Sequence, residues 1–166
     1  MKNFTISADL LAPQNMDARW ANSPFLPLKL LLPKQKGKQF ELITQEILKQ
    51  VGEKITKRTS TEHDFCANGQ SCELKGSTTT KNTDDVYSFL QIRPDQEYQN
   101  LVLTTFCFDG TITIYRIPKK DVLKLIDKGI FKRQHGGNKA NSRTFCYNGN
   151  TKPFEKYLWH KGQYVK

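Results

Sequence analysis

The chain has 166 residues and a formal net charge of +10, from 26 Lys and Arg residues against 16 Asp and Glu residues. A hydrophobic share of 37% with 11% aromatic residues excludes a wholly disordered chain. No stretch approaches the roughly 20 consecutive apolar residues that a membrane-spanning helix needs, so we expect no membrane partner.

The positive charge is distributed unevenly along the chain. Residues 116–166 contain 13 basic and three acidic residues, whereas the first 115 residues contain 13 of each. A one-sided basic surplus favours a polyanionic partner, most often nucleic acid. At this point a surplus that only keeps the protein soluble is an equal alternative.

The N-terminus and the cysteines indicate a cytoplasmic protein. Residues 1–9 are polar and lack the basic and apolar regions of a signal peptide. The four cysteines form no C-x-x-C pair, so a zinc site is not expected.

The expected elements begin after an arm of 36 residues that contains four prolines. A helix is predicted over 37–55, because apolar residues recur there every three or four positions. These residues are Phe40, Ile43, Ile47, Val51 and Ile55.

Short strands follow this helix. Segments 62–67 and 70–75 flank Asn68-Gly69, and segments 101–108 and 111–117 flank Asp109-Gly110, dipeptides that favour two-residue hairpin turns. The remaining predicted elements are a weak strand at 55–60, a strand or short helix at 86–92, a helix at 121–126, a loop at 132–142, a strand at 143–147 and a helix at 153–159. We therefore expect the α/β class: a single domain over 1–166, with a mixed β-sheet flanked by helices. Within it, we expect a core over 37–117 and a basic C-terminal part over 118–166.

The first hairpin places charged side chains together. A two-residue turn pairs Phe65 with Cys72, and therefore Asp64 with Glu73, whose Cβ atoms would lie roughly 4.5–5.5 Å apart. Lys75, two residues beyond Glu73, shares that face. The opposite face suits a core, with Phe65, Ala67, Cys72 and Leu74.

Two adjacent carboxylates repel unless they share a proton or bind a cation. Carboxylates with open positions suit Mg²⁺, which prefers oxygen ligands and keeps several waters. A neighbouring lysine could orient an attacking water and offset charge on a phosphoryl group, the layout of metal-assisted phosphodiester hydrolysis. The alternative is a solvated strand face on which Lys75 pairs with Glu62.

These residues resemble the motif of the PD-(D/E)XK nucleases. The motif elements are Asp64 followed by Glu73-Leu74-Lys75, with Gly37-Lys38-Gln39-Phe40-Glu41 at the start of a helix. Downstream, Phe89-Leu90-Gln91-Ile92-Arg93-Pro94, Tyr98 and the Gln134-His135-Gly136-Gly137 loop are similar to segments of small type II restriction endonucleases. The resemblance spans residues 37–147. One departure is His63, which stands where the family often has proline.

The resemblance implies roles for the motif residues. Asp64, Glu73 and the backbone carbonyl of Leu74 would hold Mg²⁺. Lys75 would position and help to deprotonate the attacking water. Glu41 would reach the site from its helix; alternatively, it is a helix N-terminal carboxylate that the helix dipole favours.

Several polar and basic residues are candidate DNA contacts. Arg, Asn and Gln read base edges in the major groove, and lysines suit phosphates. The candidates are Gln91, Arg93, Lys132, Arg133, Gln134, His135, Lys139, Asn141 and Arg143. Gln91 could equally be an ordinary strand residue, and 132–143 a solvated basic loop.

The resemblance implies a Mg²⁺-dependent type II restriction endonuclease that cuts double-stranded DNA in the cytoplasm of a prokaryote. It would leave a 5′-phosphate and a 3′-hydroxyl. A small chain with one site would act as a homodimer, with a cognate DNA methyltransferase as a functional counterpart rather than a physical partner. A structure-specific repair or junction-resolving nuclease and a non-enzymatic basic DNA-binding module are the alternatives.

Overall fold

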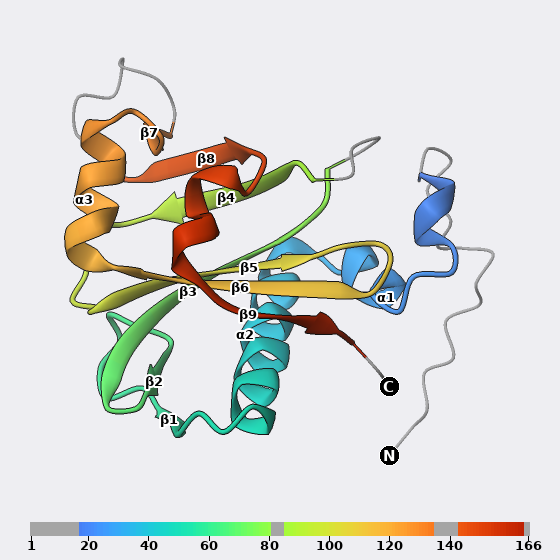
Figure 1. Cartoon of the computed structure of the whole chain (residues 1–166), viewed down its shortest axis with the longest axis horizontal. Coiled ribbons are helices and arrows are strands. Elements are labelled where there is room, and N and C mark those ends of the chain that lie inside the picture. Colours follow the sequence, from blue (N-terminus) through green and yellow to red (C-terminus); the bar gives the residue numbers. More distant parts are fainter. Residues whose placement is uncertain (1–16, 81–84, 135–142, 165–166) are drawn as a thin grey trace.

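The computed structural model describes residues 17–80, 85–134 and 143–164. It is a mixed α/β structure built around a six-stranded sheet with strand order β1-β2-β3-β5-β6-β9 (Figure 1). Of the strand pairs in the described chain, β3 and β5 run parallel and the others run antiparallel. A second, antiparallel sheet has the order β4-β8-β7.

The elements have the following bounds. The helices are a 3₁₀ turn η2 (Ala18–Trp20), α1 (Leu26–Leu30), α2 (Pro33–Gln50), α3 (Lys119–Asp127) and the 3₁₀ helix η3 (Lys152–Tyr157). The strands are β1 (Ile55–Lys57), β2 (Phe65–Ala67), β3 (Gln70–Thr78), β4 (Tyr87–Ile92), β5 (Asn100–Phe106), β6 (Thr111–Pro118), β7 (Lys132–Arg133), β8 (Phe145–Gly149) and β9 (Leu158–Gln163).

The structure confirms the first predicted hairpin and its register. Phe65 pairs with Cys72 and Ala67 with Gln70. Asn68 and Gly69 have φ angles of 50° and 78°, the two positive values that a type I′ turn requires. The turn residues therefore set which side chains of β2 and β3 face each other.

The second hairpin forms, but the prediction of a two-residue turn is wrong. Cys107 donates its backbone N–H to the carbonyl of Thr111 over 2.9 Å, which leaves three residues in the loop. Gly110 takes the positive φ angle, 91°, as the last residue of such three-residue loops commonly does.

Helix α2 begins earlier than predicted, at Pro33, and ends at Gln50. Proline favours the first helical position because its missing N–H would have no helical partner there. The buried stripe is Phe40, Thr44 and Leu48, and Val51 of the predicted stripe is exposed. Thr44 is buried because its hydroxyl donates to the Thr104 hydroxyl of β5 over 3.1 Å.

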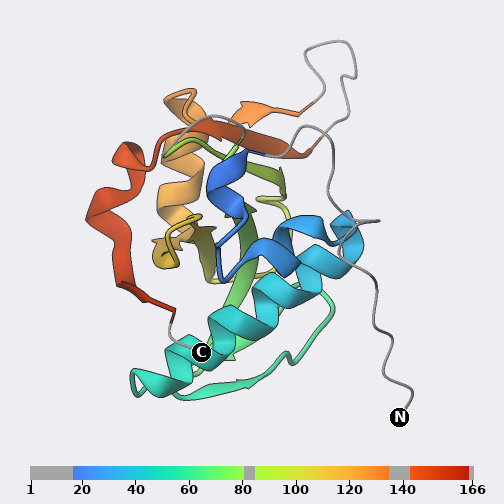
Figure 2. The ribbon, with the colours of Figure 1, turned by 90° about the vertical axis from the view of Figure 1, so that its right-hand side faces the viewer.

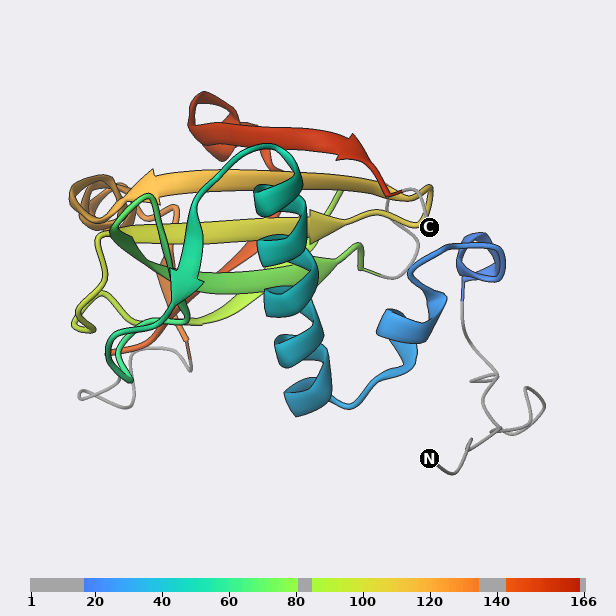
Figure 3. The same cartoon turned by 90° about the horizontal axis from the view of Figure 1, so that it is seen from below.

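Side chains alternate between the two faces of the large sheet and form two cores. On one face, Val102 and Phe106 of β5 pack with Phe40 of α2. On the other, Leu101 and Leu103 pack with residues of α3 and β4. Figure 3 shows α2 crossing this sheet on one face, and in Figure 2 α2 and α3 lie well apart. The sheet is therefore buried on both faces.

The C-terminal prediction of a helix over 153–159 is only partly correct. The 3₁₀ helix η3 ends at Tyr157, and the chain continues as β9 along the edge of the large sheet. Residues 132–133, predicted as loop, pair with β8 instead. Among the described helices, none is long and apolar enough to cross a membrane.

The close contact between α2 and β3 gives a first prediction. A Cβ atom at Gly76 would lie 2.2 Å from Cγ of Phe40, whereas one at Gly37, within α2, would meet nothing within 4 Å. We expect Gly76→Ala to lower the free energy of unfolding by about 1–3 kcal/mol through overpacking. Gly37→Ala should raise it by about 0.5–1 kcal/mol. Urea unfolding of both variants checks this, and equal effects would contradict the packing.

Candidate active site

The site lies where β2 ends and leaves one edge of β3 unpaired. The β2–β3 ladder stops at the Phe65–Cys72 pair. The backbone N–H of Leu74, beyond that point, donates to Oδ2 of Asp64 over 2.7 Å. The Asp64 carboxylate thus takes the place of a strand partner for Leu74.

Glu73 and Lys75 lie next to this edge on the same face of β3. The ammonium of Lys75 is 2.7 Å from Oε1 of Glu73, and their side chains are 19% and 8% exposed. The alternative pairing of Lys75 with Glu62 is wrong, since Glu62 lies outside β2 in a turn. Lys75 therefore stays beside the acidic pair.

Burial raises the pKa of both acidic groups. For Asp64, loss of water is the largest cause; the Leu74 N–H and Lys75 oppose it, and Glu41 adds to it. For Glu73, loss of water again raises the pKa, Lys75 lowers it, and the charge of Asp64 raises it. The two carboxyls therefore interact, and their charged forms are costly without a further cation.

Glu41 approaches Asp64 from α2. Its carboxylate accepts a hydrogen bond from Gln45 and pairs with Lys38, both at 3.0 Å. Because the helix begins at Pro33, Glu41 lies beyond the first turn, to which the helix-dipole effect is confined. That alternative for Glu41 is therefore removed, and its electrostatic link to Asp64 remains.

Lys38 is a further residue of the site and was not among the predicted site residues. Its ammonium holds Glu41, and its charge lowers the pKa of Asp64. The signal was present in the sequence, because Lys38 precedes Glu41 by three residues and such helical neighbours share a face. Tyr98, which the sequence offered only as part of the family resemblance, lies close by. Its buried hydroxyl has no hydrogen-bond partner among the described residues, and burial and then the charge of Glu73 raise its pKa.

The oxygen donors at this edge suit a hard cation. The N–H and C=O of one strand residue point to the same side, so the Leu74 carbonyl faces the same open edge as its N–H. Within the described chain, no three His, Cys, Asp or Glu side chains gather into a complete metal cage. Mg²⁺ needs no such cage, because it keeps several waters beside one or two carboxylates. Asp64, Glu73 and the Leu74 carbonyl therefore fit this ion.

The predicted DNA contacts that the structure describes gather around the small sheet. Lys132 and Arg133 form β7 and are exposed, and the Gln134 side chain accepts the backbone N–H of Gln91 over 2.8 Å. Arg93 is exposed and lowers the pKa of Glu73, so the end of β4 lies near the acidic pair.

The other four predicted contacts either lie near an acidic residue or fall outside the described residues. Arg143 is exposed and lies 3.8 Å from a carboxylate oxygen of Asp95. His135, Lys139 and Asn141 lie outside the described residues.

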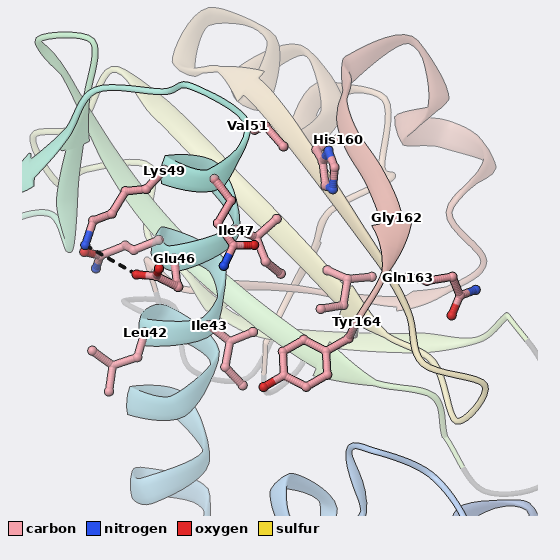
Figure 4. Close-up of a pocket in the computed structure, with 13 residues that line it drawn as sticks. Leu42, Ile43, Glu46, Ile47, Lys49, Val51, His160, Gly162, Gln163 and Tyr164 are labelled. Carbon is pink, nitrogen blue, oxygen red and sulfur yellow. Dashed lines mark ion pairs between the residues drawn. The ribbon is translucent and has the colours of Figure 1, made fainter. Parts of the chain in front are cut away.

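A hollow of about 780 Å³ lies elsewhere, between α2 and β9 (Figure 4). Its lining includes Leu42, Val51, His160 and Tyr164, and none of the predicted site residues. The open edge of β3 carries the acidic pair, so the chemistry and this hollow are separate features.

Comparisons with known proteins add little. No protein-family model and no curated protein sequence matches the chain. Among solved structures, the chain is similar to a bacterial homing endonuclease at 14% sequence identity and a TM-score of 0.42, over 55% of this chain and 69% of that one. The function therefore has to be inferred from the site.

The raised pKa of Asp64 predicts how its substitution affects stability. A carboxyl whose pKa is higher in the folded chain stabilises the fold at low pH, and this contribution is lost as the pH rises through the folded pKa. Asn keeps an oxygen for the Leu74 N–H and carries no charge. In EDTA at about pH 8, we expect Asp64→Asn to melt about 2–4 °C higher than the wild type, the shift that on the order of 1 kcal/mol gives.

The same comparison at about pH 4 should show a smaller difference, because a larger fraction of Asp64 is then protonated. Glu62→Gln, which makes the same change of charge two residues away, serves as the control. A lower melting temperature for Asp64→Asn at alkaline pH would show that the charged carboxylate stabilises the fold.

Proposed function

We propose that this protein is a Mg²⁺-dependent endonuclease that hydrolyses phosphodiester bonds in double-stranded DNA. One observation carries the proposal: two interacting carboxyls, the buried Glu73 and the half-buried Asp64, lie at an open strand edge with the Lys75 ammonium 2.7 Å from Glu73. A purely structural ion pair would need one carboxylate for one lysine. The second acid, whose pKa is raised by burial, is costly unless a cation balances it.

The acidic residues would act by binding and charge balance. When bound, Mg²⁺ would offset negative charge on the carboxylates and on the phosphate. The cation would bind the ionised forms of Asp64 and Glu73, so cation binding should weaken as the pH falls. Glu41 would support Asp64 from α2, held in place by Lys38 and Gln45.

Lys75 would act on the reacting atoms. Its ammonium lies on the face of β3 that holds Glu73, and Glu73 restrains it. In that position it can hold a water in line with the phosphorus and offset charge as the new P–O bond forms and the bond to the 3′-oxygen breaks. The products would be a 5′-phosphate and a 3′-hydroxyl.

The substrate follows from the charge around the site. Arg93 places positive charge near Glu73, in an acidic centre that would itself repel phosphate. Lys132 and Arg133 add exposed positive charge on β7. The motif resemblance supports a type II restriction enzyme. Such an enzyme would act as a homodimer, one subunit for each strand, with a cognate DNA methyltransferase protecting the host.

Loss of either key side chain should abolish cleavage. We expect Asp64→Ala and Lys75→Ala to slow Mg²⁺-dependent cleavage of supercoiled plasmid by on the order of 100- to 1,000-fold, while both variants still bind DNA. Lys57→Ala, at an exposed position on β1, is the control. Undiminished cutting by either variant would overturn the assignment.

Wild-type products on phage DNA separate the alternatives. Discrete bands indicate sequence specificity, preference for branched substrates indicates a junction-resolving nuclease, and no nicking in any divalent ion indicates a binding module.

The basic strand β7 should set the salt dependence of binding. If Lys132 and Arg133 contact phosphates, replacing both with alanine should reduce the slope of log K against log salt by about 2, since each phosphate contact contributes roughly 0.9. Lys49→Ala with Lys54→Ala removes the same charge near the C-terminal end of α2 and in the segment that follows it, and should leave the slope unchanged. Filter binding across salt concentrations checks this, and equal slopes in all three proteins would mean that the β7 charges only keep the protein soluble.

A further inference from the structure

Strand β4 contains a strained bulge that the candidate chemistry does not require. Its ladder with β8 pairs Phe89 with Tyr147 and then Ile92 with Phe145, so two residues of β4 oppose one of β8. The second of the two, Gln91, has a φ angle of 55°. Such a left-handed conformation in a residue other than glycine costs about 1–3 kcal/mol and persists only where its surroundings impose it.

The side chain of Gln134, which directly follows β7, holds Gln91 in this conformation. Oε1 of Gln134 accepts the Gln91 backbone N–H at 2.8 Å. The bulge takes this N–H out of the regular ladder, and the Gln134 amide supplies the acceptor that the ladder does not. The bulge is therefore built from two segments that are more than 40 residues apart in the sequence.

The bulge changes what β4 presents to solvent. Phe89 and Ile92 on either side of it are fully buried. Leu90 is 52% exposed and Gln91 is also exposed. A regular strand would turn one of two successive residues inward, whereas the bulge directs both outward. An apolar side chain and an amide thus protrude together.

The protruding pair lies beside the acidic site. The backbone N–H of Ser88 donates to the hydroxyl of Ser77 in β3 over 2.9 Å, and Arg93 acts electrostatically on Glu73. The bulge lies between these two anchor points, along the face of β3 that carries Glu73 and Lys75. On its other side, Gln134 connects it to the basic strand β7.

We propose that the Leu90–Gln91 bulge enters a groove of duplex DNA, with Gln91 reading a base edge, Leu90 packing against a base step and Gln134 acting as the positioning residue. This inference rests on the proposed function, because duplex DNA is the partner. Gln pairs well with adenine edges, and apolar side chains of DNA-binding proteins insert at base steps. The strained backbone would fix the positions of both side chains before DNA binds, which lowers the entropy cost of binding.

Site selection by the cleaving enzyme is the first test. We expect Gln91→Ala and Gln134→Ala to lower the ratio of cleavage rates at the preferred site and at sites that differ by one base by about 10- to 100-fold. Cleavage at the relaxed sites should remain. Gln134→Glu keeps the acceptor for the Gln91 N–H and should restore the ratio of cleavage rates to nearly the wild-type value. Leu90→Ala should also lower this ratio. Leu158→Ala on β9 is the control for loss of an exposed leucine, since Leu158 is also 52% exposed, and its ratio should match that of the wild type.

Photocrosslinking gives a readout that does not depend on cleavage. A benzophenone amino acid at position 90, in the Lys75→Ala background, should crosslink to duplex DNA, and the same group at position 158 should not. Crosslinking from position 90, together with no cleavage by the wild-type protein in any divalent ion, would support the bulge and overturn the nuclease. Cleavage with an unchanged rate ratio in both glutamine variants, and no crosslink from position 90, would overturn the bulge and leave the nuclease intact.

Discussion

Asn68 and Gly69 turn the chain with two positive φ angles, and that turn fixes which residues of β2 lie opposite which residues of β3. A shift of one residue would exchange the two faces of the hairpin. Leu74 would then face away from the α2 core, and Glu73 and Lys75 would both be buried against Phe40. Every other property of the candidate site therefore depends on this two-residue turn.

The shortness of β2 matters as much as its register. β2 begins only at Phe65, after Asp64, so no β2 residue pairs with Leu74, whose N–H binds the Asp64 carboxylate instead. An unpaired strand edge is normally a liability for aggregation. Here the acid closes it, and α2 places Glu41 near the same carboxylate. Asp64 thus both accepts the Leu74 N–H that has no strand partner and supplies a carboxylate to the acidic site.

The sequence predicts most strongly where local chemistry decides the structure. The Asn68–Gly69 hairpin and the core side chains of β2 and β3 follow from turn residues and alternation alone. Strand β9 was missed because it is an exposed edge strand without alternating apolar residues. Thr44 was missed as a core residue because only the distant Thr104 satisfies its hydroxyl. The bulge at Gln91 likewise depends on Gln134, a partner that no local pattern reveals.

The small sheet explains how a basic segment and an acidic site can work together. The positive surplus lies after residue 115 in the sequence, whereas the carboxyls lie on β2 and β3. Strand β8 pairs with both β4 and β7, which connects the basic strand β7 to β4, and Arg93 directly after β4 lies near Glu73. DNA held by β7 would thus be guided along β4 toward Lys75. The bulge lies in β4, so the strand that would attract the duplex, β7, and the bulge that would read it belong to the same small sheet.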